Sequence, residues 1–352
     1  MLNKETISLV NAKVAFTSKC NLECIYCEGK RGFCLGNQAA MEDFRRKPLD
    51  VEDISSDTLI QVLKELYKTG LRGISPTGGE PMLREDWDDL VREIATIGYD
   101  RVDLTTNGLL LESYLEKKGS LPQGLTLVKI SLDTHDSKNF KTITGGGSLE
   151  KVVSGIKAIS NQVYTRANRV LLRSELRELN PYIDFCRDLG LKEVSFLDLV
   201  CYVNKNKEKE TSYFEKEFVG YHEFANIFKK TFGVEMAPIE KWGVLFHQAT
   251  LSDGFKITFK DSSTTRRADQ CNNCKIFCQE GICLIRVATD GNLTLCPDYK
   301  AELPSYDTPR MLKEGSLLKE LNNIAEIFTS AIQVRTIEQF ALKHKIILPE
   351  II

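Results

Sequence analysis

The fold is decided by one stretch of the chain, which reads Lys13-Val-Ala-Phe-Thr-Ser-Lys-Cys20-Asn-Leu-Glu-Cys24-Ile-Tyr-Cys27. Its first five residues form a short, mainly apolar run that predicts a β-strand. Three cysteines follow at once, with the spacing C-x3-C-x2-C. If the strand belongs to a parallel sheet, the cysteines lie at the carboxyl edge of that sheet, where α/β folds place their chemistry.

Similar runs recur as far as residue 198. Those that predict buried parallel strands occupy residues 13–17, 73–77, 101–105, 126–131, 169–173 and 193–198. Amphipathic segments that predict helices occupy residues 57–69, 84–97, 149–161 and 176–189. This alternation predicts an α/β fold with a parallel sheet and right-handed crossovers. Because six strands are fewer than the eight that close a barrel, we predict an open, partial (β/α)6 barrel of the TIM type.

The pattern changes after residue 204. A charged stretch covers residues 205–209, an amphipathic segment covers residues 218–232, and the sequence beyond Gly254 is strand-like and rich in cysteine. We therefore expect two domains, a partial barrel in residues 1–204 and a C-terminal domain in residues 205–352. The C-terminal cysteines are Cys271, Cys274, Cys278, Cys283 and Cys296.

Composition narrows the classes of function. The chain of 352 residues has 47 basic and 49 acidic side chains and a formal net charge of −2, so no strong field attracts nucleic acid. The first residues lack the apolar core of a signal peptide, and no later run approaches the ~18 apolar residues of a membrane span. We expect a cytoplasmic protein that contacts no membrane. Because a reducing cytoplasm disfavours disulfides, the eleven cysteines are expected to serve another purpose.

The first cysteine cluster has the chemistry of an iron–sulfur site. Three neighbouring thiolates can bind three irons of a [4Fe–4S] cluster, which leaves the fourth iron open to a small molecule. A structural zinc site needs a fourth ligand, and the four histidines, at positions 135, 222, 247 and 345, are all far from this loop in sequence. A zinc knuckle and three buried thiols remain as alternatives.

A second motif, Thr77-Gly78-Gly79-Glu80-Pro81, follows the second predicted strand. Glycines let a backbone approach a ligand closely, and an exposed glutamate offers a negative partner. With the cysteine loop and its Tyr26, this motif resembles the signatures of the radical S-adenosylmethionine (SAM) superfamily. The resemblance implies an enzyme that cleaves SAM reductively to a 5′-deoxyadenosyl radical, which abstracts hydrogen from a substrate.

The resemblance also assigns roles to residues. It implies that Cys20, Cys24 and Cys27 bind the catalytic [4Fe–4S] cluster and that an electron donor such as flavodoxin or ferredoxin reduces it. Further residues are implied to bind SAM, namely Tyr26, Gly78, Gly79, Glu80, Pro81, Ser131 and Val200.

One branch of the superfamily is similar over more of the chain. Residues 128–136, 140–145, 149–156, 196–200 and 288–296 resemble GTP 3′,8-cyclases of molybdenum-cofactor biosynthesis. The resemblance implies four substrate residues, Lys13, Thr105, Arg169 and Arg286. Lys13 and Ser75 stand where those cyclases have arginine, and lysine or serine does not replace the planar fork that binds phosphate. We therefore expect the radical chemistry to be shared and the substrate, a peptide, a nucleotide or a natural-product intermediate, to be different.

The five C-terminal cysteines predict a second metal site. Similar cyclases hold an auxiliary cluster with three cysteines, so a second [4Fe–4S] cluster is expected here with its ligands left open among the five. A structural zinc site is the alternative. For the whole chain, two other functions stay open: the GTP cyclase itself, and a non-enzymatic iron–sulfur or zinc protein.

Overall fold

A computed structural model of the chain describes residues 4–24, 52–199, 202–204, 212–239, 244–262, 264–269, 271, 276–278, 282, 284–295 and 305–335. One twelve-stranded sheet dominates it, with the strand order β15-β14-β13-β1-β2-β3-β4-β5-β6-β10-β9-β8. Its six central strands are β1 (Asn11–Thr17), β2 (Gly73–Gly78), β3 (Arg101–Thr106), β4 (Leu127–Ser131), β5 (Tyr164–Val170) and β6 (Glu193–Leu197). Each pairs in parallel with the next, so the predicted α/β fold with an open row of six strands is confirmed.

Strands from beyond residue 204 extend the row at both ends. β13 (Ile285–Val287) pairs in parallel with β1, and β10 (Lys256–Asp261) pairs in parallel with β6. Antiparallel strands continue outward from these two: β14 (Leu293–Thr294), β15 (Ser305–Tyr306), β9 (Leu245–Thr250) and β8 (Ala237–Ile239). The division into domains at residue 204 stays a prediction, but both sides of that point contribute to one sheet.

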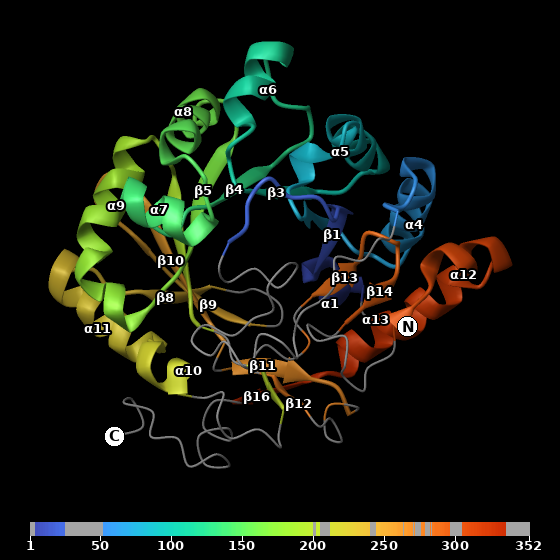
Figure 1. Ribbon diagram of the computed structural model, residues 1–352. Coiled ribbons are helices and arrows are strands. Elements are labelled where there is room, and N and C mark those ends of the chain that lie inside the picture. Colours follow the sequence, from blue (N-terminus) through green and yellow to red (C-terminus); the bar gives the residue numbers. More distant parts are fainter. Residues whose placement is uncertain are drawn as a thin grey trace.

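Helices surround the curved sheet on its outer side (Figure 1). Those of the barrel are α4 (Ser56–Lys68), α5 (Trp87–Ile97), α6 (Leu111–Lys118), α7 (Ser137–Thr144), α8 (Leu149–Ile159) and α9 (Leu179–Asp188). The others are α1 (Lys4–Leu9), α10 (Ser212–Glu217), α11 (Tyr221–Phe232), α12 (Thr308–Glu314) and α13 (Leu317–Ser330). In α4, the Ser55 side chain accepts a hydrogen bond from the Thr58 backbone N–H, and Leu59, Leu63 and Leu66 are buried on one face.

The two faces of the sheet differ in polarity. On the outer face, toward the helices, side chains such as Val14, Ile74, Ile130 and Phe196 are completely buried. Their sequence neighbours point to the inner face, because successive side chains of a strand alternate. Many of those neighbours are polar or charged, so the core lies between sheet and helices while the inside of the curve carries polar groups.

The fifth strand was predicted in the wrong place. It covers Tyr164–Val170 rather than residues 169–173. Its outward positions, Thr165, Ala167 and Arg169, are not the apolar run that a buried strand usually shows. The apolar residues that suggested a strand, Val170 to Leu172, lie at its end and lead into the 3-10 helix η2 (Arg173–Glu178).

Two small sheets complete the described structure. β7 (Tyr202–Asn204) pairs with β12 (Ile276–Cys278), and β11 (Thr264–Arg267) pairs with β16 (Ile332–Arg335). Within the described ranges, no helix combines the length and the apolar character that a membrane crossing requires.

Candidate active site

The cysteine loop leaves the carboxyl end of β1, as predicted. Cys20 and Cys24 are partly buried, whereas Tyr26 and Cys27 lie outside the described residues. Two contacts hold the beginning of the loop: the Ser18 backbone N–H donates to Asp53 Oδ1 at 3.2 Å, and the Lys19 backbone N–H donates to Thr17 Oγ1 at 3.2 Å. The loop is therefore joined at its base to the segment that precedes α4.

The Gly78–Gly79 pair packs directly against this loop. The Gly79 N–H donates to the Thr17 carbonyl at 2.7 Å, and the Glu80 N–H donates to the Lys19 carbonyl at 2.8 Å. A Cβ atom on Gly79 would lie 2.1 Å from the Lys19 carbonyl oxygen. On Gly78, whose φ is +137°, it would lie 2.3 Å from the Thr17 carbonyl oxygen. Only glycine fits at both positions, because the backbones of the two motifs touch.

Glu80 is buried, which corrects the expectation of an exposed carboxylate. Its side chain is only 1% exposed, and both of its oxygens accept hydrogen bonds. Oε1 accepts from the Thr106 hydroxyl at 2.7 Å and from the Met82 N–H at 3.2 Å, and Oε2 accepts from the Asn107 N–H at 2.8 Å. Burial raises the pKa of Glu80, although these three hydrogen bonds act in the opposite direction. The carboxylate thus joins the ends of β2 and β3. Pro81 is buried beside it as the first residue of the 3-10 helix η1 (Pro81–Leu83).

Asn107 connects the same network to the cysteine loop. Its side-chain amide donates to Asn21 Oδ1 at 2.7 Å, one residue beyond Cys20. On the other side of the loop, the Glu23 N–H donates to the Thr144 carbonyl at 3.0 Å. The segment that contains Cys20 and Cys24 is therefore held from two neighbouring loops.

Arg84 braces the base of the cysteine loop. Its guanidinium donates to the Phe16 carbonyl at 2.8 Å and to the Ile54 carbonyl at 3.0 Å. It also donates to the Ser56 hydroxyl at 2.7 Å and to Asp86 Oδ1 at 2.8 Å. Phe16 precedes the cysteines, and Ile54 and Ser56 lie where the chain returns to α4. One side chain thus joins both ends of the segment that carries the three cysteines.

Three of the four predicted substrate residues share the inner face of the sheet. Lys13 is opposite Ser75 on β2 and opposite Arg286 on β13, and Thr105 is opposite Lys129 on β4. Ser131, predicted to touch SAM, also lies on this face, at the carboxyl end of β4.

Arg169 does not point to this face. It is on the outer side of β5 and only 2% exposed. Its guanidinium forms an ion pair with Glu175 at 3.0 Å and lies 4.3 Å from the centre of the Tyr182 ring. Arg169 is therefore not beside the other three residues, and its role toward a substrate stays a prediction from the resemblance.

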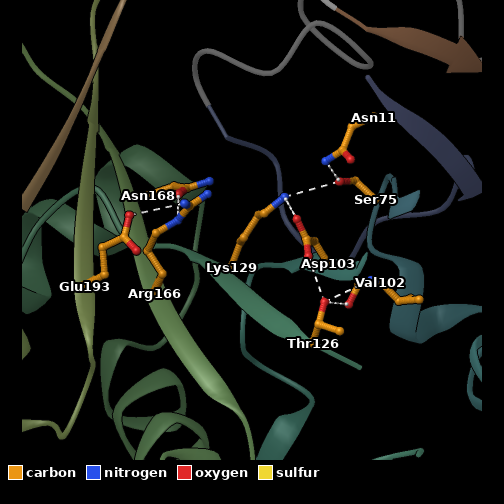
Figure 2. Close-up of polar contacts among 9 residues, drawn as sticks. All are labelled: Asn11, Ser75, Val102, Asp103, Thr126, Lys129, Arg166, Asn168 and Glu193. Atoms are coloured by element: carbon orange, nitrogen blue, oxygen red, sulfur yellow. Dashed lines mark hydrogen bonds and ion pairs between the residues drawn. The ribbon is translucent and has the colours of Figure 1, made fainter. Parts of the chain in front are cut away.

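The inner face also carries a charged network that the sequence analysis missed (Figure 2). Lys129 Nζ lies 2.9 Å from Asp103 Oδ2 and 3.2 Å from the Ser75 hydroxyl oxygen. On the next strand, Arg166 pairs with Glu193 at 3.2 Å. Burial lowers the pKa of Lys129 to about 8, with the charges of Arg166 and Lys13 acting in the same direction and Asp103 opposing them. Ser75, which stands where the resembling cyclases have arginine, thus contacts a cation from another strand.

The signal for Lys129 was present in the sequence. It is a charged residue between Val128 and Ile130, two apolar residues that are completely buried. Such alternation in a strand indicates one apolar and one polar face. Arg166 gave no comparable signal, because the strand that contains it was not predicted.

The C-terminal cysteines are described only in part. Cys271 is partly buried, and the backbone of Cys278 lies in β12 opposite Tyr202. Cys274, Cys283 and Cys296 lie outside the described residues, as does Val200. Over the parts of the chain that the structure does describe, no three His, Cys, Asp or Glu residues gather as a metal site would require. β13 and β14 form a hairpin with its turn at Asp290 and Gly291.

The donors at the first site fit an iron–sulfur cluster. Cys20 and Cys24 are soft sulfur donors at the carboxyl edge of the sheet, and the contacts of Asn21 and Glu23 fix the backbone between them. Neither cysteine is fully buried, so both have access to a bound group.

Comparison with known proteins gives concordant similarities. The family model described as the Radical SAM superfamily matches residues 14–186. A probable GTP 3′,8-cyclase of Archaeoglobus fulgidus is 35% identical over 149 residues, which is 42% of this chain and 44% of that relative. The chain thus spans less than two-thirds of that relative's length. A GTP 3′,8-cyclase of Limosilactobacillus fermentum is 27% identical over 299 residues, covering 83% of this chain and 80% of that protein.

Similarity of fold extends further. The solved structure of native anSMEcpe with bound AdoMet matches with a TM-score of 0.56 at 16% identity. The match covers 89% of this chain and 82% of that one, so the arrangement of strands and helices is shared well beyond residue 186.

Proposed function

Because the chain belongs to the radical SAM superfamily, we propose that it is an enzyme that cleaves SAM reductively and abstracts hydrogen from a substrate. The observation that carries the proposal is the packing of Gly78–Gly79 against Thr17–Lys19. It brings the cysteine motif and the glycine motif together at one edge of the sheet. A protein that only carried a cluster would need no second motif there.

Cys20, Cys24 and Cys27 would hold the irons of the first cluster. When bound, that cluster supplies the electron that cleaves SAM. The chain's own residues orient the reaction: Asn107 and Glu80 hold the loop and the strand ends in place. The backbone at Gly79 and Glu80 would then bind the methionine part of SAM, with the carboxylate of Glu80 turned inward as a positioning group.

Other parts of the proposal concern further contacts with the cofactors. Ser131 at the end of β4 and Tyr26 within the cysteine loop would contact SAM, and Val200 would pack against the adenine. A second [4Fe–4S] cluster would be bound by ligands chosen from Cys271, Cys274, Cys278, Cys283 and Cys296. A flavodoxin or ferredoxin would supply the electrons.

The test is iron and sulfide content after anaerobic reconstitution, together with SAM cleavage in dithionite. We expect about eight irons in the wild type and about four in Cys20→Ala/Cys24→Ala/Cys27→Ala, with cleavage lost in the variant. About four irons in the wild type, with cleavage intact, would keep the enzyme and remove the second cluster. Bound zinc without any cleavage would overturn the whole proposal.

A GTP 3′,8-cyclase is the second candidate. It is favoured by the names of the relatives and by the position of Lys13, Thr105 and Arg286 on one face. The side-chain types at positions 75 and 13 disfavour it, because neither Ser75 nor Lys13 has the planar guanidinium with which arginine binds phosphate. Conversion of GTP to the cyclised nucleotide by the reconstituted protein would establish this activity. SAM cleavage without GTP turnover would support only the first proposal.

A further inference from the structure

The hydrogen bonding of the sheet changes at the carboxyl end of β4. Up to this point β4 and β5 pair in register, with Ser131 opposite Asn168, and the Leu132 N–H still donates to the Asn168 carbonyl at 3.1 Å. In a parallel ladder, the next bond would run from the Val170 N–H to the Leu132 carbonyl. The Val170 N–H donates instead to Asp133 Oδ1, at 3.4 Å. The Leu132 carbonyl therefore leaves the ladder directly after Ser131.

A tyrosine from α9 takes the place of that ladder bond. The hydroxyl of Tyr182 donates to the Leu132 carbonyl, and both residues are completely buried. Burial raises the pKa of Tyr182, so its hydroxyl keeps the proton that this hydrogen bond requires. The end of β4 is thus held from the outer side of the sheet by a helix rather than by the neighbouring strand.

The ring of Tyr182 is itself held by its surroundings. The guanidinium of Arg169 lies 4.3 Å from the ring centre, and the centre of the Phe196 ring lies 6.1 Å away. Arg169 is only 2% exposed and is fixed by its ion pair with Glu175. A cation that is shielded from water attracts the face of an aromatic ring. These contacts fix the direction of the Tyr182 hydroxyl and, through it, the position of the Leu132 carbonyl.

Ser131 is the residue that this arrangement affects most directly. It is the last paired residue of β4, it faces the inner side of the sheet, and it is joined covalently to Leu132. We propose that Tyr182 is a positioning residue, which holds Ser131 where its side chain contacts SAM. This inference rests on the proposed function, which puts SAM at the carboxyl edge beside Ser131. A shift of the Leu132 backbone would move the Ser131 hydroxyl, and small displacements of a contacting group are costly.

SAM binding by the reconstituted full-length protein tests the role of Tyr182. Anaerobic isothermal titration gives the Kd of SAM, and formation of 5′-deoxyadenosine in dithionite gives the rate of cleavage. Tyr182→Phe removes only the hydroxyl, and we expect the Kd of SAM to rise about fivefold or more, as loss of one buried hydrogen bond predicts. Ser131→Ala should have a similar effect. Because Tyr182 acts through Ser131, Ser131→Ala/Tyr182→Phe should bind SAM no more weakly than Ser131→Ala alone.

Tyr99→Phe is the matched control. Tyr99 is also buried, and its hydroxyl also donates to a backbone carbonyl, that of Leu63 on α4, at 2.7 Å. It precedes β3 and so lies at the amino edge of the sheet, away from the cysteine loop. In urea denaturation, Tyr99→Phe and Tyr182→Phe should be folded and should lose similar stability. Only Tyr182→Phe should bind SAM more weakly.

The outcomes separate this inference from the proposed function. An unchanged Kd in Tyr182→Phe, additive losses in the double variant or an equal loss in Tyr99→Phe would overturn the positioning role. An unchanged Kd in Ser131→Ala would also overturn it, because Ser131 would then make no contact that needs positioning. A wild type that cleaves SAM, with Tyr182→Phe equal to it in affinity, loses only this inference. A wild type that neither binds nor cleaves SAM overturns both.

Discussion

The carboxylate of Glu80 accepts a hydrogen bond from the hydroxyl of Thr106 at 2.7 Å and so joins the end of β2 to the end of β3. Both groups are almost completely buried. A glutamate in the second motif, which the sequence suggested was a ligand for SAM, is therefore a fixed point between two strands. The cysteine loop is attached to the same point through Asn107 and Asn21.

Removal of the Glu80 carboxylate should lower the stability of the folded protein. Glu80→Ala leaves the donors of Thr106, Asn107 and Met82 without their acceptor, and we expect unfolding free energy to fall by about 3 kcal/mol. Urea denaturation under anaerobic conditions measures the change. Glu85→Ala, at an exposed position of the same segment, should have a small effect. Equal losses in the two variants would contradict the role given to Glu80.

A methyl group on Gly79 should displace the cysteine loop. The new Cβ would lie 2.1 Å from the Lys19 carbonyl oxygen, so the backbone beside Cys20 must move. We expect Gly79→Ala to lose most of the iron of the first cluster and to cleave SAM at least about tenfold more slowly, because small displacements at a reacting centre are costly. Iron content and absorbance near the cluster band report the first effect.

Gly119→Ala is the matched control for that variant. Gly119 has a positive φ of +80°, and a Cβ there would meet no atom within 4 Å. Alanine at this position introduces backbone strain without a collision, so stability should fall slightly while iron content stays at the wild-type value. If both variants lost iron, the loss would be due to backbone strain and not to the collision with the Lys19 carbonyl.

Arg84 should be needed for retention of the first cluster. Arg84→Met removes hydrogen bonds to the Phe16 and Ile54 carbonyls, which flank the cysteine segment. We expect faster loss of iron to a chelator, together with a shifted electron paramagnetic resonance spectrum of the reduced cluster. Arg92→Met, at a half-exposed position on α5, should show neither change. A stability loss without any spectral change would make Arg84 merely structural.

Asp198 should make stability depend on pH. Burial raises its pKa to about 7, and its oxygens accept hydrogen bonds from the Ser262 N–H and hydroxyl. The folded protein therefore keeps this proton up to about pH 7, whereas the unfolded chain releases it near pH 4. Stability should fall as pH rises between these values, by at most about 1.4 kcal/mol per pH unit.

Urea denaturation at several pH values measures that slope. In Asp198→Asn the side chain does not titrate, so the dependence between pH 4 and pH 7 should become flatter than in the wild type. An unchanged slope in the variant would show that other groups cause the dependence.

Strands with an apolar outer face could be predicted from the sequence, whereas contacts that depend on the register between strands could not. The strands predicted at residues 73–77 and 193–198 match β2 and β6 closely, because apolar side chains such as those of Val194 and Phe196 face the helices. β5 was misplaced, since its outward side carries Thr165 and Arg169 instead of such a run.

The candidate site divides in the same way. Both motifs were found because each is contiguous in the sequence. The contact of Lys129 with Ser75 joins residues 54 apart, and that of Arg166 with Glu193 joins residues 27 apart. Such contacts depend on which strands pair and in which register. The sequence pattern of one strand does not give this information. The burial of Glu80 could not be foreseen for the same reason, as its partners are on β3 and in the turn beyond it.

The attachment of β13 to β1 has a consequence for synthesis of the protein. The outer edge of β1, the strand that leads into the first cysteines, is covered by residues 285–287, and the corresponding edge of β6 is covered by residues 256–260. Until the ribosome has made those residues, both edges expose unpaired backbone groups, which promote association with other chains. Nascent chains that end before residue 256 should therefore need chaperone protection, and loading of the first cluster should follow translation of the last strands.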